Sequence, residues 1–406
     1  MSVTKVSSLH IYPVKSTAGI SLPHSKVEEL GLTFDRRFIV SDLSGQFITA
    51  RTEPTLCLVK TNLIDHRLEI SAPNMPTLTL SYEEFTKQYQ KVTVWGDEVS
   101  GQLCSNSANA WFSEYLQRPC KLLFFGQDSH RERKPNTDNA RKVAFADGYP
   151  LLLISQSSLD DLNSRLGDNQ QQAVSMTQFR PNIVVDNCLP FAEDTWLRIR
   201  IGEVEFKVSK PCERCIFTTV NPQSGDKHLQ QEPLRTLKSF RRNHNGEVLF
   251  GQNLIPLNSG KISQGDKLTI ITKQKPPLFP HTDLASDTPS AKVSVKNDKV
   301  EAKSVNKKLN IFFEKWNKNY QTPSLNQNSN VQGNDKAKTV LEHGEDAGLI
   351  LPYSCRAGMC GRCKAKLVSG EVEQFSSDGL TAQEKQDGYI LCCSAIATND
   401  VVIKHE

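Results

Sequence analysis

The sequence predicts a mainly β protein with α+β elements, and two observations lead to this expectation. Short runs of alternating apolar and polar residues recur through the first two thirds of the chain, for example at residues 6–12 and 37–41. Turn residues separate such runs, as at residues 42–45 and 96–97. Many short strands with few helices favour a closed or bent β-barrel.

Two helices interrupt this pattern, and strands resume after them. The first is expected at residues 106–117, where the apolar side chains fall near one face. The second is expected at residues 157–166, where Ser157 and Asp160 form a start signal. Further strands are expected at residues 181–186, 196–201, 204–208 and 267–272.

The C-terminal quarter has a different pattern. A strand is expected at residues 309–314 and a short helix at residues 339–348. Gly348 would end this helix, and Pro352 prevents it from restarting. The polar stretch at residues 322–333 is interpreted as a long hairpin tip.

Composition narrows the class of protein. A chain of 406 residues is expected to hold two or three domains, and a net charge of +4 does not favour a nucleic-acid partner. No apolar run approaches the ~18 residues that suggest a membrane span. The first residues lack the apolar core of a secretory signal, so a cytoplasmic location is expected. Eleven cysteines then favour metal ligands or reactive thiols over disulfides. The basic run at residues 130–134 is interpreted as a solvated loop, with a lip over an anionic pocket or a docking patch as the alternatives.

A flexible linker is predicted at residues 273–305. Prolines and then lysines recur there among small polar residues, a composition that cannot bury much apolar surface. The segment either gives the following domain reach or is an inert spacer. The linker separates residues 306–406 from the preceding part of the chain, in which the family resemblance described below implies two domains, residues 1–120 and 121–272.

Three cysteines near the C-terminus have a specific spacing. Cys355, Cys360 and Cys363 follow the pattern C-x4-C-x2-C, and adjacent cysteines follow at Cys392 and Cys393. This is the ligand spacing of plant-type [2Fe–2S] clusters, which work at about −400 mV. A zinc knot or plain buried cysteines are the alternatives. Cys392 and Cys393 would face opposite sides of an extended segment, so spacing alone leaves the fourth ligand open.

A second short motif, Cys212-Glu-Arg-Cys215, is ambiguous. It could be half of a zinc site or a thioredoxin-like redox pair, but neither a second cysteine pair nor a βαβ context accompanies it. One of the two could be a ligand or nucleophile whose pKa is lowered by Lys210 and Arg214. Buried structural thiols are the remaining alternative.

Resemblance to known families adds to these readings. Residues 306–406 resemble plant-type ferredoxin domains, which implies a β-grasp fold, and the match of Tyr389-Ile-Leu-Cys-Cys-Ser to the ferredoxin pattern puts Cys393 in register as the fourth ligand. Residues 3–272 resemble the MOSC family with its N-terminal β-barrel partner, most of all the amidoxime-reducing components and bacterial proteins that detoxify N-hydroxylated purines. The matching pieces are dispersed and ordered: Ile11-Tyr-Pro-Val-Lys-Ser16, Asp35-Arg36, Asp161-Leu-Asn-Ser-Arg-Leu166, Phe179-Arg-Pro-Asn182, Cys212-Glu-Arg-Cys215, Thr218-Thr-Val-Asn-Pro222, Pro233-Leu-Arg-Thr-Leu237 and Leu249-Phe-Gly-Gln252.

The MOSC resemblance implies a molybdenum-pterin cofactor with Cys215 as the thiolate ligand of the metal. A soft thiolate suits such a sulfur-rich site. Asp147 and Asn253 fall where family members line the metal pocket, although the family often has tyrosine at the position of Asn253. The resemblance also implies a set of groups for the pterin phosphate, in which arginine binds bidentately and lysine as a point charge. These groups are Lys15, Ser16, Arg36, Arg180, Asn182 and Arg214.

The resemblance implies a reductase of N-hydroxylated small molecules, such as hydroxylaminopurines and amidoximes, with its own [2Fe–2S] relay. The sequence shows no dinucleotide-binding glycine motif, so an external flavoprotein reductase is the expected electron donor, with the flavoprotein subunit of sulfite reductase as a candidate. Asp147 is a candidate for proton delivery. The alternatives are a sulfur carrier like the cofactor sulfurases and a plain electron carrier.

Overall fold

The computed structural model describes residues 3–64, 67–133, 141–279, 291–295, 308–322, 338–349, 351–353, 356, 358, 361–377 and 379–405. The chain divides into two compact units. The first comprises Met1–Glu213, Phe217–Lys238 and Leu249–Leu278. The second comprises Arg214–Ile216, Ser239–Val248 and Phe279–Glu406. Both units are built mostly from strands, so the predicted class, mainly β with α+β elements, is confirmed.

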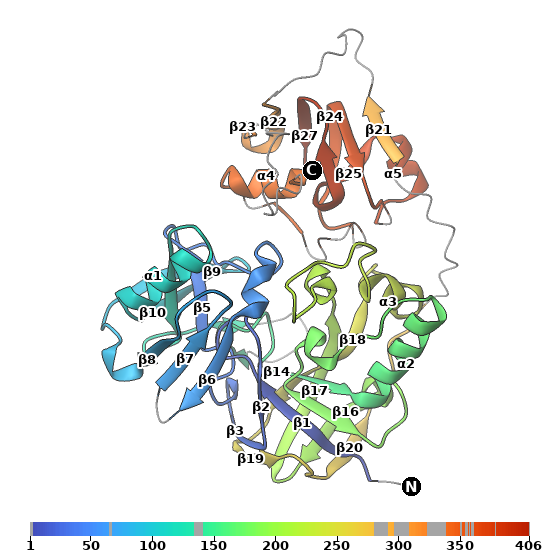
Figure 1. Ribbon diagram of the computed structural model, residues 1–406. Helices are drawn as coiled ribbons and strands as arrows, with labels where there is room; N and C mark the ends of the chain where they lie inside the picture. Colours follow the sequence, from blue (N-terminus) through green and yellow to red (C-terminus); the bar gives the residue numbers. More distant parts are fainter. Residues whose placement is uncertain are drawn as a thin grey trace. The chain divides into compact units, whose positions relative to one another are not determined.

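The first unit is organised around a sheet of eight strands in the order β2-β1-β15-β14-β18-β17-β16-β20 (Figure 1). Every pairing in it is antiparallel except that between β14 and β15. The strands predicted in this part of the chain are confirmed. Their bounds are β1 (Lys5–Ile11), β2 (Ile20–Leu22), β14 (Leu151–Ser155), β15 (Ile183–Asp186), β16 (Trp196–Ile201), β17 (Val204–Glu213), β18 (Leu249–Pro256) and β20 (Leu268–Lys273).

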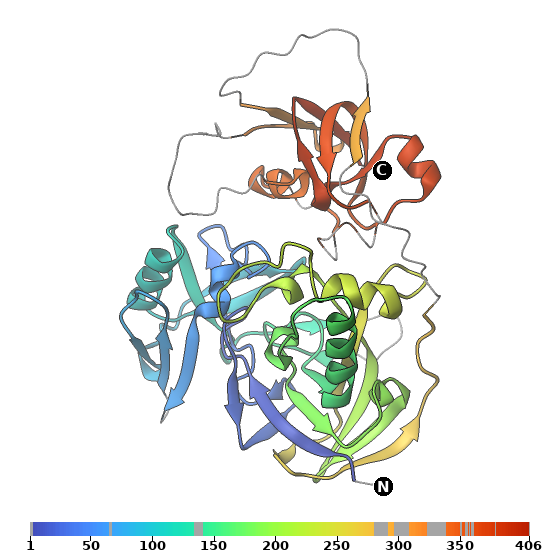
Figure 2. The same cartoon turned by 45° about the vertical axis from the view of Figure 1, so that its right-hand side comes forward.

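Helix α2 (Gln156–Asp168) connects the two parallel strands, as a parallel pair requires a crossover. It packs against β14 and β15, and Figure 2 shows it in green beside the sheet. The predicted helix is confirmed, but its N-cap is Ser155 rather than Ser157. The Ser155 hydroxyl accepts from the Ser158 N–H at 3.1 Å, so the last residue of β14 already starts the helix.

The rest of the first unit contains smaller sheets. A four-stranded sheet has the order β5-β11-β10-β9, and α1 (Asn106–Tyr115) connects β10 to β11, as predicted. Its strands are β5 (Phe38–Asp42), β9 (Tyr89–Val94), β10 (Asp97–Leu103) and β11 (Cys120–Phe124). The other sheets are formed by β3 (His24–Glu28), β4 (Gly31–Leu32) and β19 (Gly260–Ser263), by β6 (Lys60–Ile64), β7 (Arg67–Ser71) and β8 (Leu78–Ser81), and by β12 (Glu132–Arg133) and β13 (Arg141–Lys142). Helix α3 (Leu234–Arg241), which the sequence reading missed, runs across the division between the units.

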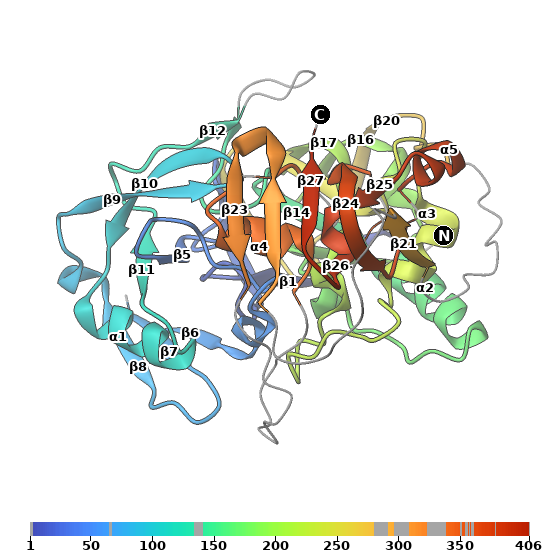
Figure 3. The ribbon, with the colours of Figure 1, turned by 90° about the horizontal axis from the view of Figure 1, so that it is seen from above.

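The second unit contains a sheet in the order β21-β24-β27-β22-β23, with β25 and β26 paired to β24; Figure 3 shows β24 and β27 side by side. The predicted strand at 309–314 and helix at 339–348 are confirmed. Thr339 and Glu342 form a capping box at the start of α4. The bounds are β22 (Asn310–Phe313), β23 (Lys318–Gln321), α4 (Val340–Asp346), β24 (Lys364–Gln374), α5 (Ala382–Gln386), β25 (Tyr389–Leu391), β26 (Ala395–Ala397) and β27 (Val401–Lys404).

One strand lies inside the segment predicted to be a linker. Strand β21 (Ala291–Val295) pairs antiparallel with β24, so this part of residues 273–305 belongs to the sheet of the second unit. Alternation of Val293 and Val295 with polar residues was the available signal, and the surrounding lysines obscured it. Residues 323–337, which hold most of the predicted hairpin tip, lie outside the described residues. None of the described helices is long and apolar enough to cross a membrane.

Candidate functional site

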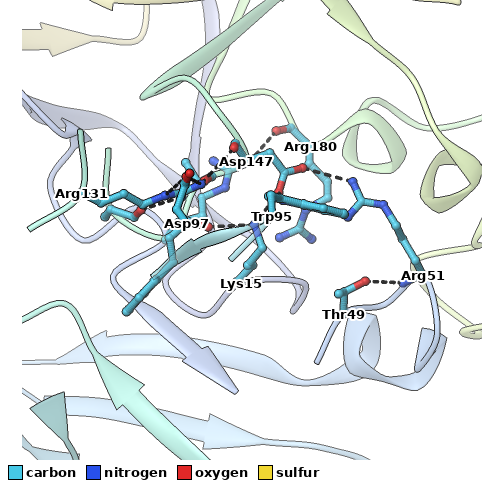
Figure 4. Close-up of polar contacts among 12 residues, drawn as sticks. Lys15, Thr49, Arg51, Trp95, Asp97, Arg131, Asp147 and Arg180 are labelled. Atoms are coloured by element: carbon cyan, nitrogen blue, oxygen red, sulfur yellow. Dashed lines mark hydrogen bonds and ion pairs between the residues drawn. The ribbon is translucent and has the colours of Figure 1, made fainter. Parts of the chain in front are cut away.

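A buried lysine marks the first part of the candidate site (Figure 4). Lys15 follows β1, and its Nζ donates to the Phe145 carbonyl at 2.8 Å and forms an ion pair with Asp147. Burial, together with the charges of Arg131 and Arg51, lowers the pKa of Lys15 to about 8 despite the neighbouring carboxylate. The site therefore holds a lysine whose charge is lost at mildly alkaline pH.

Asp147 collects donors from several turns of the chain. Its Oδ1 accepts from the Trp95 indole N–H at 2.9 Å and from Lys15, and its Oδ2 accepts from Arg51 at 3.3 Å. Partial desolvation alone would raise the pKa of Asp147, but the charges of Lys15 and Arg51 hold it well below its usual range. An ionised carboxylate of this kind orients cations. A role of Asp147 in proton delivery stays a prediction.

His130 and Glu132 are exposed, as expected for the solvated loop predicted at residues 130–134, and Lys134 lies outside the described residues. Arg131 corrects this interpretation. Its side chain is buried and pairs with Asp97 at 2.8 Å. The same guanidinium donates to the carbonyls of Ala144, Ala146 and Asp147 at 2.6–3.3 Å. Arg131 therefore fixes the backbone of the segment that presents Asp147. The surrounding run of charges concealed this role because a pattern of basic residues does not reveal burial.

Arg36 and Asn182 form a second group in the first unit. One Arg36 nitrogen donates to both Asp35 oxygens at 2.6–2.7 Å and to the Asn182 side-chain oxygen at 3.1 Å. Asn182 is buried, and its amide also donates to the His10 carbonyl at 3.1 Å and accepts from the Leu152 N–H at 3.1 Å. These contacts use the Asn182 side chain to join β1 to β14 and to orient Arg36.

Arg180 lies close to Arg36. The carbonyl of Arg180 accepts from the Arg36 guanidinium at 3.1 Å, and its own guanidinium donates to the Thr17 carbonyl and stacks over the Tyr12 ring at 4.1 Å. Burial and the Arg36 charge lower the pKa of Arg180 to about 10. Within the described ranges, no carboxylate forms an ion pair with Arg180.

Three of the predicted cofactor-binding residues share an unusual backbone conformation. Ser16, Arg36 and Arg180 have φ values of 75°, 48° and 57°, in the left-handed region that non-glycine residues rarely occupy. Each such residue costs about 1–3 kcal/mol and persists where the surrounding structure requires it, often at a functional site. The three residues come from separate loops of the chain, and the Arg36 guanidinium joins two of these loops through the Arg180 carbonyl.

The charge distribution of this region suits an anionic ligand. The site brings together three cationic residues, Lys15, Arg36 and Arg180. The pKa values of Lys15 and Arg180 are lowered because burial and neighbouring cations oppose their charge. A bound phosphate would relieve this opposition and accept hydrogen bonds. The residues present therefore fit the phosphate of a pterin cofactor.

The predicted metal thiolate follows β17 directly. Cys215 is half-buried and comes two residues after Glu213, the last residue of that strand. The preceding Arg214 is buried, and its N–H donates to the Val248 carbonyl at 2.8 Å. Asn253 on β18 is half-buried, and its amide donates to the Pro211 carbonyl at 3.3 Å. This contact holds the end of β17, which contains Cys212 and leads into Cys215.

Two predicted cluster ligands come together in the second unit. Cys363, just before β24, and Cys393, in the short 3-10 helix at Cys392–Ser394, are both buried, with their sulfurs 3.1 Å apart. The Gly358 N–H donates to the Cys393 sulfur at 3.2 Å. Gly358 has φ of 70°, and an added Cβ would lie 2.6 Å from the Ser376 carbonyl, so only glycine fits there. Thiols that converge with a backbone donor fit an iron–sulfur cluster.

Cys392 points to a different environment. It is buried, and its sulfur lies 3.7 Å from His405 Nε2. Burial raises the pKa of Cys392 well above its usual value, as expected for a structural thiol. These contacts support Cys393 over Cys392 as the fourth ligand. Cys355 and Cys360 lie outside the described residues, and within those residues no group of three or more potential ligand side chains is placed to hold a metal ion.

Some residues of the first-unit site were missed by the sequence analysis. Arg51, Trp95 and Arg131 all contact Asp147, yet none lies in a recognisable motif. The dipeptide Trp95-Gly96 between two alternating runs was the available signal, since a hairpin turn favours small polar residues over tryptophan.

Profiles of three families match the chain in order. The MOSC N-terminal beta barrel domain matches residues 3–119, and the MOSC domain matches residues 140–269. The 2Fe-2S iron-sulfur cluster binding domain matches residues 325–398. The order agrees with the resemblance read from the motifs.

Curated relatives match about two thirds of the chain. Mitochondrial amidoxime-reducing component 1 of Mus musculus is 36% identical over 286 residues, which are 66% of this chain and 83% of that protein. Molybdenum cofactor sulfurase of Oryza sativa subsp. japonica is 36% identical over 282 residues, which are 65% of this chain and 34% of that protein. Among solved structures, phthalate dioxygenase reductase matches 25% of this chain and 27% of its own at 25% identity, with a TM-score of 0.19 that carries no argument.

Fold and sites together define a redox protein with two separate cofactor centres. The chain belongs to the MOSC family that includes the amidoxime-reducing components, and it carries a C-terminal 2Fe-2S domain. It is an oxidoreductase that binds a molybdenum cofactor and a [2Fe–2S] cluster, and the 2Fe-2S domain exchanges electrons with a redox partner.

Proposed function

We propose that the chain is a molybdenum-dependent reductase of N-hydroxylated compounds, with hydroxylaminopurines and amidoximes as the substrate class. The overall step is R–NHOH plus two electrons and two protons, giving R–NH2 and water. One observation carries the proposal: a single chain contains both a cation-lined site that includes MOSC motifs and a pair of converging cluster thiols. The relatives named as amidoxime-reducing components support the same substrate class.

Each residue has a proposed part in holding the cofactors. Cys215 would ligate molybdenum, and Arg36, Arg180 and Arg214 would bind the pterin phosphate. Asn182 would act indirectly, since its amide holds the Arg36 guanidinium. When bound, molybdenum supplies two-electron redox chemistry and polarises the departing oxygen of the substrate. Cys355, Cys360, Cys363 and Cys393 would hold the cluster, which supplies the electrons singly.

The remaining residues shape the site around the reacting group. Ionised Asp147 would keep the Lys15 ammonium in place, and Arg131 would fix the backbone of the segment that carries Asp147. Asn253 would set the pocket shape where relatives often carry tyrosine. The electron donor would be an external flavoprotein reductase, for which the flavoprotein subunit of sulfite reductase is a candidate.

The sulfurase-like alternative is less well supported. The chain spans about a third of the length of the rice sulfurase that it matches, and a cluster domain does not assist sulfur transfer. A plain electron carrier would not need a cation-lined site in the first unit. Metal analysis separates this carrier from a reductase, because the carrier would contain iron without molybdenum.

Anaerobic turnover tests the proposal directly. Holoprotein reduced under argon is mixed with benzamidoxime or 6-hydroxylaminopurine, and the reduced product, benzamidine or adenine, is measured by chromatography. We expect one product molecule for every two electrons lost, no product from Cys215→Ala, and wild-type yield from Cys212→Ala as the matched control. Reduced, molybdenum-loaded wild-type protein that yields no product would refute the proposal.

A further inference from the structure

We propose that Trp95, together with Arg51, is a positioning residue that holds the Asp147 carboxylate, and through it the Lys15 ammonium, in one orientation at the cofactor site. The inference rests on the proposed function for the roles of Asp147 and Lys15. Neither Trp95 nor Arg51 lies in a family motif quoted above. Figure 4 shows both side chains together with Asp147.

The first observation is a conflict between Trp95 and its own turn. Strands β9 and β10 form a hairpin in which Val94 pairs with Asp97, so Trp95 and Gly96 are the two loop residues. Their φ values of 55° and 86° are both positive, as in the type I′ turn that favours Asn-Gly. A bulky aromatic residue is rare in this conformation. Local turn preference therefore does not explain a tryptophan here, and such violations are expected at functional positions.

The second observation is what the Trp95 side chain contacts. Its indole N–H donates to Asp147 Oδ1 at 2.9 Å, across 52 positions of sequence. The Arg51 guanidinium stacks over the ring at 4.1 Å, and the Phe47 ring meets it edge-on at 5.0 Å. The left-handed turn thus directs a flat ring between these partners and aims its single donor at one carboxylate oxygen.

The two oxygens of Asp147 have different donors. Trp95 and Lys15 share Oδ1, whereas Arg51 donates to Oδ2 at 3.3 Å. Because Arg51 also stacks on Trp95, the two donors hold each other as well as the carboxylate. The Asp147 side chain is 60% exposed, so packing alone does not fix its orientation. Directional donors must therefore supply this restraint.

The rival explanation is that Trp95 only anchors the hairpin. The two explanations predict opposite effects of one substitution. Trp95→Asn places a preferred residue in the turn while removing the indole donor and the stacking surface. A hairpin anchor would lose stability on this change, whereas a positioning residue would lose function without losing stability. Trp95→Phe keeps a ring but removes the donor. Glu98→Gln is the matched control, because it alters an exposed ion pair with Lys91 on the same hairpin.

The test compares purified full-length holoprotein of the four forms. Melting temperature and molybdenum per chain measure folding and loading, the EPR spectrum of the dithionite-reduced molybdenum centre reports on its surroundings, and kcat and KM are measured with benzamidoxime. We expect Trp95→Asn to keep its melting temperature and molybdenum content, to change the EPR spectrum, and to lower kcat about tenfold, a loss in keeping with displaced site groups. Trp95→Phe should show the same spectral change with a smaller loss of kcat, and Glu98→Gln should match wild type.

Two outcomes would overturn the inference. A wild-type EPR spectrum with kcat within twofold of wild type in Trp95→Asn would remove the positioning role. The second outcome combines two results. Trp95→Asn would show a lower melting temperature and a proportional loss of molybdenum, and Trp95→Phe would show a wild-type spectrum and a wild-type kcat per molybdenum. Together these results would leave only the anchor role. If wild type itself reduces no N-hydroxylated compound, the proposed function fails, but the EPR comparison still decides the role of Trp95.

Discussion

The two cofactor regions are built by different physical means. In the first unit, charged side chains from distant parts of the chain meet: Lys15 and Asp147 are 132 positions apart, and Arg36 and Asn182 are 146 apart. In the second unit, thiols and a glycine backbone N–H meet, and the two described ligand cysteines are 30 positions apart. The first site depends on burying charge, and the second on the conformation of one loop.

This difference determines what each site responds to. Burial lowers the pKa values of Lys15 and Arg180, so protonation and anion binding are linked at the first site. The second site is set by the φ of 70° at Gly358 and by the direction in which each cysteine points, neither of which varies with mild changes of pH. Substitution and pH should therefore separate the two regions experimentally.

The largest expected effect is the loss of a whole cofactor from the second unit. Cys393→Ser should abolish the visible absorption of the cluster because it replaces a thiolate ligand. Cys392→Ser should keep most of that absorption, because the Cys392 sulfur lies 3.7 Å from His405 Nε2, whereas it is the Cys393 sulfur that lies 3.1 Å from the Cys363 sulfur. Molybdenum per chain should match wild type in both variants. Visible spectra and metal analysis check this prediction, and the reverse pattern would show that Cys392 is the ligand.

A smaller, graded effect is expected in the first unit as pH rises. The pKa of Lys15 is lowered to about 8, so its charge is present below pH 8 and is lost as pH increases through that value. If this charge supports the site, turnover of benzamidoxime should fall up to tenfold for each pH unit above about 8. The Lys15→Arg variant keeps its charge to a much higher pH, so its alkaline decline should disappear.

The second unit supplies the control for this pH experiment. The cluster is reduced chemically, and its visible absorption is monitored during the reduction. The extent of reduction should not decline between pH 7 and 10. An alkaline decline that persists unchanged in Lys15→Arg would assign the effect to another group.

How far the sequence predicted each region follows from the same contrast. The cluster loop was predictable because its ligands lie close in sequence at a spacing specific to one cofactor. The strands around the first site were predictable from alternation, and Arg36 and Arg180 were singled out by dispersed motifs. The contacts of Arg51, Trp95 and Arg131 with Asp147 were not predictable, since no local pattern shows which distant residues the fold brings together. Strand β21 was missed because its pairing with β24 outweighs a composition typical of linkers.

The smallest expected effect tests whether the two units unfold separately. Thr339→Ala removes the capping box of α4, and Ser105→Ala removes the N-cap of α1 in the first unit. Each loss should cost about 1 kcal/mol. The same loss of free energy lowers the melting temperature of a small domain more than that of a large one. Thr339→Ala should therefore lower the melting temperature of the second unit by roughly 4–8 °C, and Ser105→Ala should lower that of the larger first unit by roughly 2–4 °C. Calorimetry combined with cluster absorption assigns each transition, and cluster loss should shift in Thr339→Ala alone. A common shift in both variants would mean that the charge-built and loop-built regions share one cooperative transition.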